Sequence, residues 1–178
     1  CVMFNSILYV ADSKLALPAL MQSIIVACYT FSGALFVVLV TPMNKKWGSY
    51  KSIQIVMIAA TVLFAVFGLI GLNSAVILIL HGLLTGGTFA LATAFTYGLL
   101  YQIIDIAFLK SNEQLEGSVI SFATLGYKIG AAAAASITAG FLTIVGYDPA
   151  AESKAEVLGH IDYMLTMLPA ALLFISIL

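Results

Sequence analysis

Charged side chains are scarce in this sequence, where Asp, Glu, Lys and Arg together make up only 8% of 178 residues. Soluble domains carry about 25% of such residues. Arginine is absent, because all seven cations are lysines, and the formal net charge is −1. The chain therefore lacks the basic surface that binds nucleic-acid phosphates, and we expect no nucleic-acid partner.

Cysteine and the familiar catalytic motifs are also lacking. The two cysteines, Cys1 and Cys28, have no partner at the spacing of a metal or redox motif. The sequence contains no phosphate-binding loop of the form GxxxxGK[ST] and no recognisable nucleophile or acid/base motif. We therefore predict a protein that is not an enzyme and that has neither a metal site nor a cofactor.

Apolar residues are abundant: they make up 62% of the chain, and the mean hydropathy is +1.12. A bilayer core about 30 Å thick requires about 20 apolar residues in a helix, and lipid admits only helices or closed barrels. The apolar runs are too long for barrel strands. We predict an all-α transmembrane bundle over residues 1–178, with spans at about 1–11 (partial), 15–43, 52–72, 74–104, 118–146 and 159–178.

The lysines between the spans indicate an orientation, because basic residues remain preferentially on the cytoplasmic side. One side of the predicted bundle carries four of them, Lys45, Lys46, Lys51 and Lys110, whereas the other carries only Lys14 and Lys154. We expect the loops around Lys45 and Lys110 to be cytoplasmic. The protein is predicted to be a multi-pass protein of a bacterial inner membrane.

Lys128 is the most informative single residue. It lies about eleven residues into its predicted span, which places it roughly 16 Å deep at 1.5 Å per residue. A cation at the bilayer midplane costs about 2.5–3.5 kcal/mol on insertion scales, so we expect Lys128 to face a water-filled cavity. A snorkelling lysine and a purely structural ion pair are the alternatives.

Other polar residues accompany Lys128 inside the predicted spans. Ser121 and Thr124 lie seven and four residues before it, so all three share one helical face. Interhelical hydrogen bonding is the simpler explanation for either residue alone. We take the following as further candidate solute- or cation-binding residues: Tyr127, Thr93, Thr96, Gln22 and Tyr29.

Two GxxxG pairs predict close helix packing. They are Gly126 with Gly130, beside Lys128, and Gly82 with Gly86 in the preceding span. In the latter span Thr85, Thr88, Thr96 and Ala92 fall on one face. Such a face is suited to a polar ligand, although packing explains it almost as well.

The polar segment 105–117 resembles the cytoplasmic connector between the tenth and eleventh helices of the glycoside-pentoside-hexuronide:cation symporters. Four residues match the family pattern: Asp105, Lys110, Glu116 and Gly117. Ser111 stands in place of the family's threonine, and Gln102 in place of its first aspartate. Downstream, Lys128-Ile129-Gly130 resembles the family's Lys-x-Gly, and the span that contains Pro169 resembles its twelfth helix.

The resemblance implies a major-facilitator fold, with this chain as its C-terminal six-helix bundle, helices 7–12, the first of them truncated. It implies a cation-coupled symporter that works by alternating access, together with an N-terminal six-helix half. The implied solute is a sugar or a similar small polar molecule, and the coupling ion is Na⁺ or H⁺. Lys128 and Thr124 match family positions near the sugar and cation site, and Asp105, Lys110 and Glu116 match a cytoplasmic gate.

Two other classes of function stay open. A non-transporting membrane sensor or lipid-binding protein on the same fold would bind its ligand without ion-dependent accumulation. A membrane-embedded enzyme would require an acid/base or metal cluster, for which the sequence gives no motif. Because the sequence starts inside an apolar run, we also expect this chain to be part of a longer protein.

Overall fold

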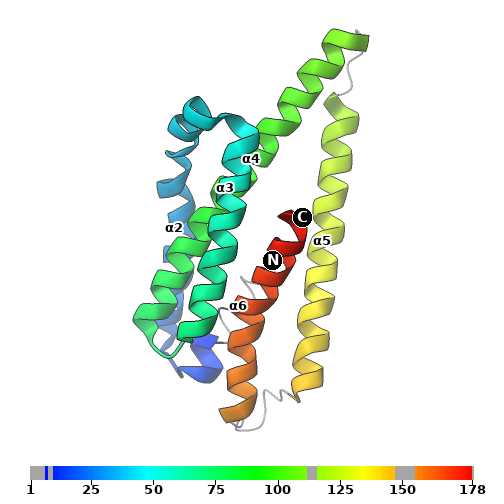
Figure 1. The fold of residues 1–178 in the computed structure, drawn as a ribbon. Coiled ribbons are helices and arrows are strands. Elements are labelled where there is room, and N and C mark those ends of the chain that lie inside the picture. The colour runs from blue at the N-terminus through cyan, green and yellow to red at the C-terminus, as the bar shows by residue number, and fades with distance from the viewer. Residues whose placement is uncertain (1–6, 8–9, 112–115, 147–154, 178) are drawn as a thin grey trace.

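A computed structural model describes residues 7, 10–111, 116–146 and 155–177. Every element in these ranges is a helix (Figure 1). They are the π-helix η1 (Val10–Lys14) and the α-helices α2 (Ala19–Val37), α3 (Val40–Ile70), α4 (Ala75–Ser111), α5 (Glu116–Val145) and α6 (Ala155–Ile177). The first four of these α-helices, α2 to α5, are long and apolar enough to cross a membrane. The predicted all-α transmembrane fold is confirmed.

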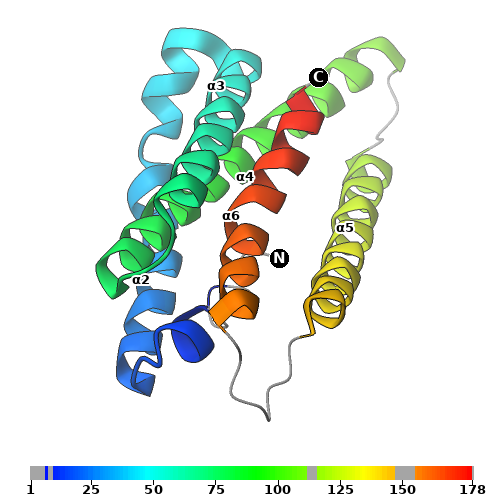
Figure 2. The same ribbon diagram turned by 60° about the horizontal axis from the view of Figure 1, so that its bottom comes forward.

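Helices α2, α3 and α4 pack together on one side of the bundle (Figures 1 and 2). Glycine permits the contact between α2 and α4. A Cβ atom on Gly86 would collide with the Ser32 hydroxyl and with the backbone oxygen of Tyr29, and one on Gly87 would collide with the Phe36 ring. The close approach predicted from Gly82 and Gly86 is therefore confirmed.

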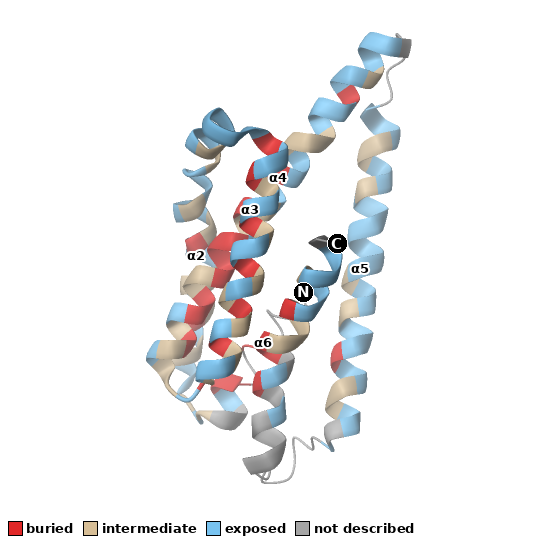
Figure 3. Cartoon of the chain, in the orientation of Figure 1, coloured by how far each residue is buried: buried red, intermediate tan, exposed pale blue. Residues whose placement is uncertain are grey.

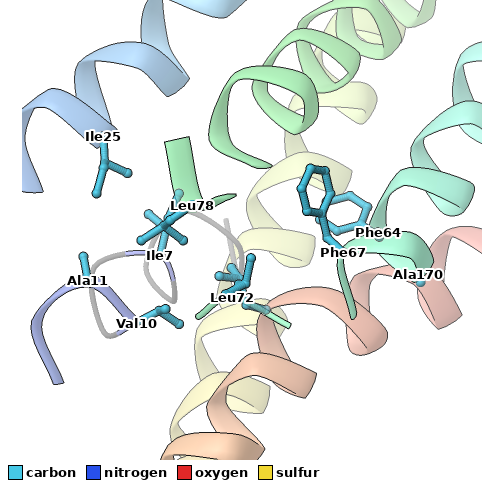
Figure 4. Packing of buried hydrophobic residues seen from close by; sticks show 10 residues of the cluster. Ile7, Val10, Ala11, Ile25, Phe64, Phe67, Leu72, Leu78 and Ala170 are labelled. Carbon is cyan, nitrogen blue, oxygen red and sulfur yellow. The ribbon is translucent and has the colours of Figure 1, made fainter. Parts of the chain in front are cut away.

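The buried apolar side chains form a cluster at the end of the bundle where α3 turns into α4. Ile7 and Val10 meet Leu72 and Leu78 there, and Phe64 and Phe67 project from α3 into the same cluster (Figure 4). Asp162 of α6 joins this end, because its Oδ2 accepts a hydrogen bond from the backbone N–H of Leu72 at 3.3 Å. The carboxylate thereby holds the turn after α3 against α6.

The segment 44–49, which we expected to separate two spans, is helical rather than a loop. It forms the start of α3, and the helix is broken at Gly48, whose φ of 76° and ψ of 165° are not helical. Ser49 donates a hydrogen bond to Asn44 Oδ1 at 2.8 Å and accepts one from Gln102 Nε2 at 2.9 Å. These bonds connect both sides of the break to α4.

The polar connector predicted from Asp105 is also helical in its first part. Helix α4 continues to Ser111, and Glu116 begins α5; the rest of the connector lies outside the described residues. The start of α3, which contains Lys45, and the end of α4, which contains Lys110, lie at the same end of the bundle (Figure 1), which agrees with the assignment of both lysines to one side of the membrane.

Helix α5 stands apart from the rest of the bundle. It packs only lightly against α4 and α6, and nearly all of its described residues are exposed or half-buried (Figure 3). The close approach predicted from Gly126 and Gly130 is wrong, because no described atom lies within 4 Å of a Cβ built on either residue. Small residues permit close packing, but here they face open space.

Candidate functional site

A cavity of about 400 Å³ opens between α5 and the other helices. Small-molecule sites typically have volumes of about 300–1000 Å³ and mostly apolar walls with a few polar groups. Each of the five α-helices contributes to the lining: Tyr29 from α2, Phe64 from α3, Thr85 from α4, Tyr127 from α5 and Pro169 from α6. The cavity is therefore central to the bundle and belongs to no single helix pair.

The polar lining consists of two tyrosines and two threonines. Thr85 donates its hydroxyl proton to the His81 carbonyl at 2.5 Å, and Thr88 donates to the carbonyls of Leu84 and Thr85 at 3.1 and 3.0 Å. Because a hydroxyl has one proton and two lone pairs, both threonine oxygens keep acceptor capacity. These oxygens can accept hydrogen bonds from a ligand that has hydroxyl groups.

The rest of the lining is apolar. Phe64 and Phe89 contribute aromatic side chains, and Gly130 with Ala131 and Ala134 gives α5 a smooth wall. An aromatic ring offers a large apolar surface at little conformational cost. This cavity therefore fits a compact ligand that has apolar faces and a few hydroxyl groups.

Of the predicted solute- and cation-binding residues, Tyr29 and Tyr127 line this cavity. Gln22 does not. Its side-chain amide donates to Asp12 Oδ1 at 3.0 Å and to the Leu17 carbonyl at 2.8 Å, so it ties the start of α2 to the preceding turn.

The stripe of Ser121, Thr124 and Lys128 lies beside the cavity-lining face of α5. All three residues are exposed, and at about 100° per residue the stripe is centred roughly 100° around the helix from the face formed by Tyr127 and Ala134. None of these three residues lines the cavity. A water-filled environment for Lys128 stays a prediction.

Thr93 and Thr96 are exposed on α4 and do not line the cavity. Their hydroxyls donate to the carbonyls of Phe89 and Ala92 at 2.9 and 2.8 Å, a common arrangement for threonine within a helix. The predicted gate residues are exposed as well: Asp105 and Lys110 lie on the last turns of α4, and Glu116 is the first residue of α5.

Four of the polar and aromatic lining residues were absent from the list of candidate binding residues: Phe64, Thr85, Thr88 and Phe89. The threonines carried a signal, because they share one face of α4 with Ala92, which also lines the cavity. The phenylalanines carried none. An aromatic residue in an apolar span is equally suited to lipid, to the core and to a cavity.

His81 lies one helical turn before Thr85 and is completely buried. Two phenylalanine rings contact it in T-shaped geometry: the His81 ring centroid is 5.7 Å from that of Phe64 and 5.0 Å from that of Phe67. Neither ring nitrogen has a hydrogen-bond partner among the described residues. An unsatisfied buried polar group lowers the free energy of unfolding by about 1–3 kcal/mol. The burial of this imidazole among apolar side chains is therefore unfavourable for stability.

A family model described as "MFS/sugar transport protein" matches residues 1–178. No curated protein and no solved structure matches the chain. Because the family model covers the whole sequence, the chain belongs to this family of major facilitator sugar transporters.

Proposed function

We propose that this member of the MFS/sugar transport protein family provides one half of a cation-coupled symporter for a sugar or a similar small polar solute. The central cavity is the observation that carries the proposal. Its volume of about 400 Å³, its aromatic walls and its threonine and tyrosine hydroxyls suit a compact polyhydroxylated solute. In this proposal an N-terminal six-helix half forms the opposite wall of the cavity, and the protein lies in a bacterial inner membrane.

Transport in this proposal proceeds by alternating access, in which two helical bundles rock around a central site. Helix α5 is suited to such a movement, because it packs lightly and lines the cavity with small residues. A displacement of α5 changes the cavity without breaking an interlocked helix contact. The connector with Asp105, Lys110 and Glu116 acts as the cytoplasmic gate.

We assign coupling to Na⁺ or H⁺ to Lys128, an exposed residue of α5 that follows the cavity-lining Tyr127 in the sequence. Its ammonium group pairs with a carboxylate of the N-terminal half, and a coupling cation competes for that carboxylate. Binding of the cation and of the solute thereby become linked, because each changes the electrostatic free energy of the other.

Removal of single hydroxyl groups tests the cavity. The full-length protein that contains this chain is reconstituted in proteoliposomes, and uptake of D-glucose, D-galactose, D-xylose and D-glucuronate is measured with Na⁺ and pH gradients imposed separately. Tyr29→Phe and Tyr127→Phe each remove one hydroxyl from the cavity. Loss of a solute hydrogen bond of about 1.4 kcal/mol raises the KM about tenfold.

Tyr97→Phe is the matched control, because Tyr97 is exposed on α4 and does not line the cavity. Its KM should equal that of the unsubstituted protein. If Tyr29→Phe and Tyr127→Phe also had the KM of the unsubstituted protein, the placement of the solute in this cavity would be contradicted. The absence of gradient-driven uptake for every sugar would contradict symport.

A further inference from the structure

The unpaired imidazole of His81 lies directly behind the wall of the cavity. Phe64 lines the cavity and contacts the His81 ring, with 5.7 Å between centroids and an interplanar angle of 70°. Thr85, one turn further along α4, lines the same cavity and donates its hydroxyl to the His81 carbonyl. The imidazole therefore contacts a side chain that lines the cavity.

The second aromatic neighbour of His81 does not reach the cavity. Phe67 contacts the imidazole edge-on at 5.0 Å, but it does not line the cavity and belongs to the apolar cluster at the α3–α4 turn (Figure 4). Of the two aromatic rings that contact His81, Phe64 is the one that lines the cavity.

A neutral imidazole carries one N–H donor and one acceptor nitrogen, and a sugar hydroxyl is likewise both a donor and an acceptor. Buried polar groups are almost always paired, so a histidine with two unpaired nitrogens is poorly explained by this conformation alone. Leucine would fill the same apolar layer without leaving polar atoms unpaired. Among the described residues, His81 has no hydrogen-bond partner for either ring nitrogen.

We infer that His81 is a concealed solute-binding residue, which becomes a hydrogen-bond partner for a solute hydroxyl when the Phe64 side chain moves out of the cavity wall. The inference rests on the proposed transport function and extends it to a second layer of the site. Phe64 is then the positioning residue that exposes or covers His81.

Chemical modification tests the accessibility of His81 without reference to any sugar. Diethyl pyrocarbonate acylates imidazole nitrogens, and the rate at each histidine of the reconstituted full-length protein is followed by peptide mass spectrometry. His160, which is exposed, serves as the internal reference. Phe64→Ala should raise the rate at His81 at least tenfold, whereas Phe67→Ala, the matched control, should leave it within twofold of the unsubstituted protein.

Equal acceleration by the two variants would overturn the inference, because opening the cavity side would then have no special effect. The same holds if neither variant accelerates the reaction. This outcome is independent of transport: if no sugar is taken up, the proposed function fails while the modification rates still report on the route to His81.

A second experiment addresses recognition of the solute itself. His81→Gln keeps a donor and an acceptor, whereas His81→Leu removes both. For whichever of D-glucose, D-galactose, D-xylose and D-glucuronate is transported, His81→Leu should raise the KM about tenfold and His81→Gln should change it less than threefold. The thermal midpoint of His81→Leu should be no lower than that of the unsubstituted protein, because the core loses unpaired polar atoms. An unchanged KM in a folded His81→Leu variant would overturn the inference.

Discussion

Gly86 and Gly98 provide a quantitative test of the α2–α4 contact, because they lie on the same helix in opposite surroundings. A Cβ on Gly86 would collide with the Ser32 hydroxyl and the Tyr29 backbone oxygen, whereas no described atom lies within 4 Å of a Cβ on Gly98. Replacing glycine by alanine inside a helix stabilises the helix by about 1 kcal/mol, because alanine has the higher helix propensity. Gly98→Ala should therefore stabilise the protein by about that amount.

Gly86→Ala gains the same helix propensity, but its methyl group overpacks the contact between α2 and α4, which lowers the free energy of unfolding by about 1–3 kcal/mol. The propensity contribution cancels between the two variants, so the difference in their free energies of unfolding reports the overpacking alone. The backbone oxygen of Tyr29 cannot rotate away as a side chain does, so relief requires α2 to shift as a whole. We expect the measured difference to lie in the upper part of that range.

The assay is reversible unfolding of the full-length protein in mixed micelles, with the fraction of SDS as the denaturing variable. The expected order of stability places Gly98→Ala first, the unsubstituted protein second and Gly86→Ala last. Because a shift of α2 also moves Tyr29 in the cavity wall, Gly86→Ala should weaken sugar uptake while Gly98→Ala leaves it unchanged. Equal stability of the two alanine variants would refute the close contact.

Two further predictions concern α5 and α6. Lys128→Ala should abolish sugar accumulation driven by an ion gradient in proteoliposomes, because in the proposed mechanism the Lys128 ammonium group balances a carboxylate of the N-terminal half; unchanged accumulation would contradict the role proposed for Lys128. Asp162→Ala should cost about 1–3 kcal/mol of unfolding free energy, because the buried Leu72 N–H loses its acceptor; hydrogen exchange at the Leu72 amide should accelerate, and an unaltered exchange rate would show that this bond does not hold the turn.

The helical class of this fold was predictable because a bilayer leaves so few alternatives. Once the apolar runs exceed the length of a barrel strand, helices are the only spanning structure left. The Gly82–Gly86 contact was predictable for a related reason, since small residues at that spacing mark close helix approach. The same rule failed at Gly126 and Gly130, because sequence spacing shows which residues share a face but not whether another helix covers it.

The candidate site was less predictable than the fold. Polarity identified Tyr29 and Tyr127, whereas the aromatic wall at Phe64 and Phe89 has no signature that distinguishes it from a core or a lipid-facing surface. The sequence spacing showed that Ser121, Thr124 and Lys128 share one face of α5. A single sequence does not show which face of that helix turns toward its neighbours, so the position of Lys128 relative to the cavity was not predictable. The helical extension beyond Asp105 was missed because charged residues continue a helix as readily as they form a loop.

Helix α4 has a mechanical consequence. Its 37 residues form one continuous element, roughly 55 Å long at 1.5 Å per residue. Thr85 and Thr88 lie in its first half, and Asp105 and Lys110 lie in its last two turns. The C-terminal end of α4 projects past the other helices (Figure 1). When α4 moves as a rigid rod, a displacement of its C-terminal end also tilts Thr85 and Thr88. The helix therefore links its membrane-surface end mechanically to the wall of the cavity.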